Sequence, residues 1–175
     1  MENLENLKVL FEESELQKRI GEIAKVIDKD YEGTDEVVVI CILKGAVFFT
    51  VDLIRKMKTP IVLEMMQVSS YAGTETTGTI SIKKDLDESI EGKDVLIVED
   101  IIDTGYTLRA LREDLISRNP KSLKIAVLLD KKERRRVEVP VDYVGFEIPD
   151  KFVVGCGFDV DERGRNIPYV GYLEK

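Results

Sequence analysis

The chain has 175 residues, of which 43% are hydrophobic, and this is enough to bury one sizeable core and to form one domain over residues 1–175. Its 34 acidic residues outnumber its 26 basic ones, and the formal charge of -8 disfavours non-specific binding to nucleic acid or to an anionic membrane. The absence of histidine excludes serine or cysteine triads that rely on imidazole, and zinc sites with histidine ligands.

Membrane and secretion signals are also missing from the sequence. No apolar stretch approaches the ~20 residues that a membrane helix needs, and the start, MENLENLKVL, lacks the basic-then-apolar order of a secretory signal. Cys41 lies in the apolar run VVVICIL and Cys156 is far away in sequence, a usage typical of reduced thiols. We therefore expect a cytoplasmic protein with no membrane partner.

The first elements predicted along the chain are a helix and a buried strand. Ser14 and Gln17 have the spacing of a capping box. Apolar residues follow at helical spacing, at Leu16, Ile20, Ile23 and Ile27. Val37 to Leu43 is a continuous apolar run, largely β-branched, which predicts a strand buried on both faces of a parallel sheet.

A second helix and strand come next, followed by a segment of different texture. Ala46 to Lys58 predicts a helix that stops at Thr59-Pro60, and Ile61 to Val68 predicts a strand. Ser69 to Thr79, SSYAGTETTGT, is small, hydroxylated and rich in glycine. Because these residues have little to bury, we expect residues 69–79 to form an exposed, mobile loop; the alternative is a plain connector.

The remaining predicted elements continue the alternation. Asp94 to Val98 predicts a strand, Thr107 to Ser117 a helix, and Leu123 to Leu129 another buried strand. Strands that alternate with helices indicate an α/β fold with an open, mainly parallel sheet flanked by helices. Ligands of such sheets bind beyond the carboxyl ends of the strands.

The densest chemistry lies in VLIVEDIIDTGYTL, from Val95 to Leu108. The strand delivers two adjacent acids, Glu99 and Asp100, to the carboxyl edge of the sheet. A turn from Asp103 to Thr107 then supplies a glycine, two threonine hydroxyls and the start of a helix, whose unpaired amides attract phosphate. By spacing alone, acids at a strand end are more often only a solvated loop.

The complete string resembles the signature of the type I phosphoribosyltransferase family, which binds phosphoribosyl pyrophosphate (PRPP). Leu43-Lys44-Gly45 upstream and VGFEIPDKFVVG, Val144 to Gly155, downstream are similar to the hypoxanthine-guanine branch of that family. The resemblance extends from about Val37 to Tyr172. It implies a small hood formed by terminal segments, and a purine-salvage enzyme that transfers the phosphoribosyl group to N9 of hypoxanthine or guanine, giving IMP or GMP and pyrophosphate.

For PRPP, the resemblance implies that the turn from Asp103 to Thr107 holds the 5'-phosphate. The contacts would come from the backbone amides and from the side chains of Thr104 and Thr107, with Gly105 and Tyr106 in the same turn. Glu99 and Asp100 would face the ribose hydroxyls and Mg2+, for which hard oxygen ligands are suited. Asp159 would lie near a magnesium ion and the purine, although by composition alone it belongs to a solvated acidic loop.

For the leaving group, the resemblance implies that Lys44 and Gly45 bind pyrophosphate and that the Lys44–Gly45 peptide can switch to the cis form. Arg165 would clamp the same group. In the predicted loop, Ser70 and Tyr71 match the family's closing residues.

For the purine, the resemblance implies that Asp103 is the general acid/base on the N7 side, although an acid at this position also caps the helix. Lys131 would donate to the 6-oxo group. Phe152 would stack on the base and Val153 would contact it through the backbone, while the alternative for Phe152 is a core position. Lys132 and Arg134 to Arg136 are interpreted as a solvated basic face.

Three residues depart from the family pattern: Tyr106, Cys156 and Gly164. Tyr106 bears on local phosphate packing, and the departures together bear on fine base selectivity and loop order, but the acids, Lys131 and Arg165 are in place. One competing function is a regulator that uses the same fold to bind PRPP or nucleotides; the other is a magnesium-dependent phosphohydrolase with an aspartate nucleophile. The resemblance also implies a homodimer or homotetramer.

Overall fold

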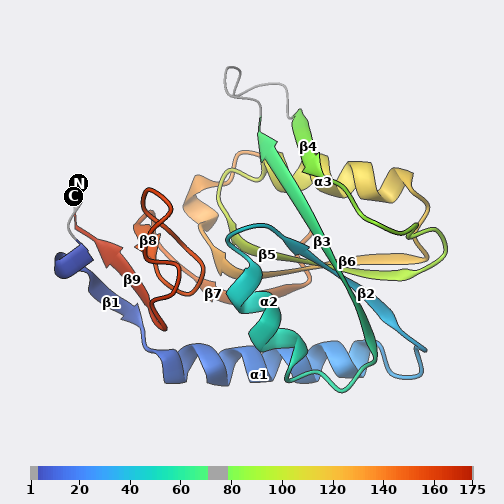
Figure 1. Cartoon of the computed structure of the whole chain (residues 1–175), viewed down its shortest axis with the longest axis horizontal. Helices are drawn as coiled ribbons and strands as arrows, with labels where there is room; N and C mark the ends of the chain where they lie inside the picture. Colours follow the sequence, from blue (N-terminus) through green and yellow to red (C-terminus); the bar gives the residue numbers. More distant parts are fainter. Residues whose placement is uncertain (1–3, 71–78, 175) are drawn as a thin grey trace.

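The computed structural model describes residues 4–70 and 79–174 and contains two sheets (Figure 1). The elements in chain order are η1 (Leu4–Asn6), β1 (Lys8–Phe11), α1 (Glu13–Asp30), β2 (Val37–Ile42), α2 (Val47–Ile54), β3 (Ile61–Ser70), β4 (Ile80–Lys84), β5 (Asp94–Ile102), α3 (Tyr106–Ser117), β6 (Ser122–Asp130), η2 (Lys132–Arg134), β7 (Tyr143–Glu147), β8 (Phe152–Val154) and β9 (Val170–Leu173).

The larger sheet has the strand order β4-β3-β2-β5-β6-β7. All of its pairs are parallel except β3 with β4, which is antiparallel. Alternate residues of β2 face opposite sides: Val39 packs in the cluster that contains α1 and α2, and Ile40 packs in the cluster that contains α3. The prediction of an open, mainly parallel sheet flanked by helices is therefore confirmed.

The smaller sheet is the predicted hood of terminal segments (Figure 1). Its order is β1-β9-β8, and both of its pairs are antiparallel. Lys8 of β1 is in register with Tyr172 of β9, and Val153 of β8 is in register with the same residue from the other side. The strand that carries Phe152 thus depends on segments from both ends of the fold.

The structure corrects two helix boundaries. Helix α1 starts at Glu13, because Glu12 has extended backbone and its amide donates to Oε2 of Glu15 at 2.9 Å. The predicted box of Ser14 and Gln17 is therefore wrong. Helix α2 ends at Ile54, not at Lys58; the amides of Lys58 and Thr59 donate to the carboxylate of Asp28 instead of to helix carbonyls.

The segment expected to be a loop from residue 69 to residue 79 is shorter in the structure. Ser69 and Ser70 belong to β3 and pair with Ser81 and Ile80 of β4, a strand that the sequence did not reveal. Residues 71–78, which include Tyr71, lie outside the described residues.

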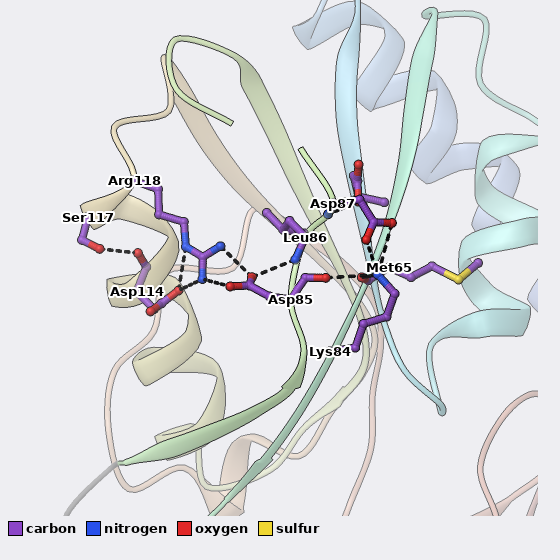
Figure 2. A network of polar contacts seen from close by, with 9 residues as sticks. Met65, Lys84, Asp85, Leu86, Asp87, Asp114, Ser117 and Arg118 are labelled. Carbon is purple, nitrogen blue, oxygen red and sulfur yellow. Dashed lines mark hydrogen bonds and ion pairs between the residues drawn. The ribbon is translucent and has the colours of Figure 1, made fainter. Parts of the chain in front are cut away.

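A polar network holds the chain that leaves β4 between β3 and α3 (Figure 2). Arg118, just after α3, donates to both carboxylate oxygens of Asp85, at 2.7 and 3.1 Å, and also contacts Asp114. Lys84 donates to the carbonyl of Met65 on β3 at 3.2 Å. These contacts fix one end of the β3–β4 hairpin.

The helix lengths and the state of the two cysteines agree with what the sequence predicted. Within residues 4–70 and 79–174, no helix is long and apolar enough to cross a membrane. Cys41 and Cys156 are both buried free thiols.

Candidate active site

Two adjacent carboxylates lie near the carboxyl end of β5, one of the two central strands of the larger sheet. β5 continues to Ile102, four residues beyond the predicted end, so that Glu99 and Asp100 lie within the strand. Glu99 is in register with Val127 of β6. Burial, and then the neighbouring Asp100, raise the pKa of Glu99 well above its usual range. Burial also raises the pKa of Asp100, against the opposing effects of its hydrogen bonds with Glu99 and the Ile101 amide and of the charge of Arg165. A cation at this edge would stabilise the ionised pair.

Two glycines bring three chain segments into contact beside these acids. A Cβ on Gly45 would lie 1.7 Å from Oδ2 of Asp100, and a Cβ on Gly157 would lie 2.1 Å from the carbonyl oxygen of Gly45. The end of β5, the loop after β2 and the loop after β8 are therefore stacked. The cis peptide that the structure contains here is Leu43–Lys44, one position earlier than the Lys44–Gly45 bond that the sequence analysis named.

Lys44 and Arg165, the two cations expected to bind pyrophosphate, are linked through Glu162. Lys44 Nζ lies 2.8 Å from Oε2 of Glu162, and Arg165 Nη2 lies 3.4 Å from Oε1 of the same residue. Arg165 also pairs with Asp159 at 2.9 Å. The nearby Lys44 lowers the pKa of Glu162. Glu162 was not predicted from the sequence, and its backbone has a φ of 62°, in the left-handed region.

Arg165 is also anchored by the loop after β8. Its Nη1 donates to the carbonyl of Gly157 at 2.8 Å, and its Nε is buried with no hydrogen-bond partner among the described residues. The structure thus brings Asp100, Gly45, Asp159 and Arg165 to one region, as the resemblance implied.

The turn before α3 is open at its helix end. Gly105 has a φ of 92° and precedes Tyr106, the first residue of the helix. The carbonyl of Thr104 accepts hydrogen bonds from the amides of Arg136 and Val137, at 3.0 and 3.3 Å. These bonds hold the turn in place. The first amides of α3 have no intrahelical acceptor, and such amides are suited to binding an anion.

A ring of four alternating charges lies next to this turn. Arg134 Nε donates to Oδ1 of Asp103 at 2.9 Å, and its Nη1 donates to Oδ2 of Asp150 at 3.2 Å. Lys131 Nζ lies 3.2 Å from Oδ1 of Asp150 and 3.9 Å from Oδ2 of Asp103. Each acid therefore contacts both cations. The ring is held in place because the amide of Lys131 donates to the carbonyl of Ile102 at the end of β5.

The solvated basic face expected at Lys132 and Arg134 to Arg136 is wrong only at Arg135, which is partly buried and pairs with the buried Asp130 at 3.0 Å. The other three cations are exposed, and Lys132 pairs with Glu147. Arg134 nevertheless belongs to the ring, because the three-residue spacing of the short helix η2 places it on the same side as Lys131.

The hood contributes an exposed aromatic ring. Phe152 is 46% exposed, which contradicts the core alternative, while the next residue, Val153, is buried. Successive residues of a strand point to opposite faces, so Phe152 of β8 points outward where Val153 points inward. Ser70 is exposed at the end of β3.

Comparisons with known proteins agree with this geometry. The family model for the phosphoribosyl transferase domain matches residues 8–162. The hypoxanthine-guanine phosphoribosyltransferase of Aquifex aeolicus is 49% identical over 169 residues, covering 96% of this chain and 95% of that protein. The hypoxanthine phosphoribosyltransferase of Salmonella typhimurium is 50% identical over 167 residues, covering 94% of each.

Solved structures give the same result. A crystal structure of a hypoxanthine-guanine phosphoribosyltransferase from Bacillus anthracis superposes with a TM-score of 0.92 at 45% identity, covering 95% of this chain and 98% of the other. A hypoxanthine phosphoribosyltransferase from Staphylococcus aureus gives 0.92 at 47% identity, covering 99% and 96%. The family model matches most of the chain, and relatives about half identical to it cover nearly its whole length. The chain therefore belongs to the phosphoribosyltransferase family, in its hypoxanthine-guanine branch.

Proposed function

We propose that this protein transfers the phosphoribosyl group of PRPP to N9 of hypoxanthine or guanine, giving IMP or GMP and pyrophosphate. The observation that carries the proposal is the pair formed by Lys131 Nζ and Asp103 Oδ2, 3.9 Å apart. A 6-oxopurine has an acceptor oxygen and N7 as neighbours on one edge, and this pair offers a donor and a proton-handling oxygen side by side.

The sugar end of PRPP fits the turn from Asp103 to Thr107. The free amides at the start of α3, with the hydroxyls of Thr104 and Thr107, would hold the 5'-phosphate, and Gly105 and Tyr106 shape the turn. Carboxylates are unsuited as direct phosphate ligands, so Glu99 and Asp100 would instead contact the ribose hydroxyls.

A magnesium ion that arrives with PRPP fits the residues at the sheet edge. Among the residues that the structure describes, no three acid, cysteine or histidine side chains gather closely enough to hold a metal alone. Magnesium commonly takes one or two carboxylates together with substrate phosphates, so Glu99 and Asp100 would be the ligands at the sheet edge, and Asp159 would lie near a magnesium ion on the loop after β8. When bound, the ion neutralises charge on the departing pyrophosphate.

The leaving group would be bound by Lys44, the Gly45 amide and Arg165. Breaking the anomeric bond leaves positive charge on the ribose and negative charge on pyrophosphate, and fixed cations stabilise the second of these. Arg165 is already oriented by Gly157 and Asp159, which reduces the ordering needed on binding. Ser70 and Tyr71 are further proposed donors to pyrophosphate, and residues 69–79 are proposed to close over the site.

Base selection would rest on Lys131, Phe152 and Val153. Lys131 donates to a 6-oxo group, whereas the 6-amino group of adenine cannot accept such a bond. The exposed ring of Phe152 is available for stacking, and the backbone of Val153 would meet the Watson-Crick edge. Asp103 would take the proton on the N7 side as the bond to N9 forms.

We further propose a cytoplasmic homodimer or homotetramer. Apolar side chains are exposed on α2 and on the adjoining part of β3, at Phe48, Val51, Leu63 and Met65. Ile61 of the same strand packs in the cluster of α1 and α2, so that Leu63 and Met65, which alternate with it, face the same side of the sheet as α2. A subunit contact would cover these side chains.

The test is to mix the protein with PRPP, magnesium and each purine base in turn and to identify the nucleotide formed. IMP or GMP with pyrophosphate supports the proposal, and chelation of the metal should abolish the reaction. Release of inorganic phosphate would favour the phosphohydrolase, and PRPP binding without turnover would favour the regulator. Sedimentation of the same sample gives the oligomeric state.

A further inference from the structure

The charge ring contains a side chain whose role is not explained by binding of either substrate. Arg134 contacts Asp103 with Nε and Asp150 with Nη1, and so uses the two ends of its planar fork on two different carboxylates. We propose that Arg134 is a positioning residue that fixes the carboxylate of Asp103 so that Oδ2, and not Oδ1, meets N7 of the purine. This inference rests on the proposed function.

The geometry of the Asp103 carboxylate gives the reason. Oδ1 is occupied by the 2.9 Å bond from Arg134, whereas Oδ2 faces Lys131 at 3.9 Å with no closer cation among the described residues. A carboxylate at the rim of a loop can otherwise rotate about its terminal torsion, which has a broad energy profile. Occupying one oxygen stops that rotation and leaves the other beside the donor for the 6-oxo group.

Asp150 keeps Arg134 and Lys131 at a fixed spacing. It accepts from Arg134 and from Lys131, each at 3.2 Å. Because an ammonium group has three donors, Lys131 can keep Asp150 while it donates to a purine oxygen. The ring therefore need not open when the base binds.

A purely stabilising role for Arg134 is the competing interpretation. Its side chain is 45% exposed, and ion pairs at such exposure contribute little to stability. The expected effect of losing it is therefore in the contact with N7 and not in the melting temperature. A lysine at this position would keep the charge but lack the planar fork, so it would hold the Asp103 carboxylate in a less defined orientation.

Two base analogues separate these roles, because nitrogen and carbon are exchanged between ring positions 7 and 9. 9-Deazahypoxanthine carries a hydrogen on N7, and 7-deazahypoxanthine carries carbon at that position; both keep the 6-oxo group. Their inhibition constants against hypoxanthine would be measured at saturating PRPP in the wild type, Arg134→Gln, Arg134→Lys and Lys132→Gln. Lys132 is the matched control, because it is a cation of the same turn that pairs with Glu147 outside the ring.

We expect Arg134→Gln to raise the inhibition constant of 9-deazahypoxanthine by about tenfold, which corresponds to one hydrogen bond to a charged group. The inhibition constant of 7-deazahypoxanthine should change by less than about twofold. Arg134→Lys should recover part of the loss, and Lys132→Gln should match the wild type. Equal weakening of both analogues, or no change in their ratio, would overturn the role of Arg134. An inactive wild-type chain would overturn the proposed function and this inference together, whereas an active wild type with an unchanged ratio overturns the inference alone.

Discussion

Gly45 and Asp100 are packed so closely that a side chain on the glycine would occupy the position of a carboxylate oxygen, with Cβ 1.7 Å from Oδ2. Asp100 can move away only by rotating its side chain, which breaks the 2.7 Å bond that the amide of Ile101 donates to Oδ1. We therefore predict that Gly45→Ala folds normally but lowers kcat/KM for PRPP by about tenfold or more. Steady-state kinetics and a melting curve on the same sample test this, and wild-type kinetics would contradict it.

Gly157→Ala should instead lower stability. The new Cβ would lie 2.1 Å from the backbone carbonyl of Gly45, and the backbone has a φ of 102° that alanine adopts at a cost. We expect a loss of about 2–4 kcal/mol in urea unfolding. Gly33→Ala is the matched control, since Gly33 also has positive φ but a Cβ there meets nothing within 4 Å. The same loss in both variants would mean that the contact with Gly45 contributes nothing.

Asp103→Asn should keep the fold and the binding of PRPP, because the turn keeps its amides and the asparagine oxygen can still accept from Arg134. Turnover should fall by about a hundredfold, since the amide cannot take the N7 proton. Calorimetry with PRPP and the rate of IMP formation measure the two effects separately. Unchanged turnover would remove Asp103 from the proposed chemistry.

Lys131→Ala should raise KM for hypoxanthine more than KM for PRPP, because only the base loses a donor. Both deaza analogues keep the 6-oxo group, so the inhibition constants of both should rise by the same factor, in contrast to the expectation for Arg134→Gln. Equal increases in KM for hypoxanthine and PRPP, together with a lowered melting temperature, would indicate that the variant misfolds because it lacks a side chain that is buried in the wild type.

Asp94, far from the site at the start of β5, should make stability depend on pH. Burial raises the pKa of Asp94, but hydrogen bonds from Ser122 and Lys121 outweigh it and lower the pKa below its usual value. The carboxylate therefore stabilises the fold above the unfolded pKa of about 3.9, and this contribution is lost as the pH falls through the lower folded value.

Asp94→Asn should thus lower the free energy of unfolding by about 1 kcal/mol at pH 7. The difference in free energy of unfolding between the variant and the wild type should become smaller as the pH falls below about 4. Urea unfolding over a pH series gives both curves. Asp35→Asn, at an exposed position, serves as control. If this difference in free energy of unfolding stays constant down to the lowest pH, the ionised form of Asp94 is not its cause.

The elements that the sequence predicts best are those whose signal is local. Every residue of β2 is buried, and its uninterrupted apolar run predicted this directly. Glu99 and Asp100 follow from the position of acids after such a run. β8, in contrast, is three residues long and exists only because β9 pairs with it, and β4 is a half-buried edge strand with no clean alternation.

The contacts of the charge ring were hidden for a similar reason. Arg134 reaches Asp103 across 31 positions of sequence, and both lie in short connecting segments. Neither a helical period nor a strand alternation links such residues, so composition alone made Arg134 a surface cation. The bond depends on how β5 and β6 end at the same sheet edge, which becomes visible only in three dimensions.

The pairing of β1 with β9 constrains when the protein becomes competent during its synthesis. On the ribosome the chain emerges from its amino end, so β2, β5 and the turn before α3 can dock long before residue 170 has been made. β8 has no partner strand until β9 leaves the exit tunnel, and β1 must wait equally long. A nascent chain can therefore form its phosphate-binding edge early, whereas the wall that presents Phe152 is completed only as the last strand is released.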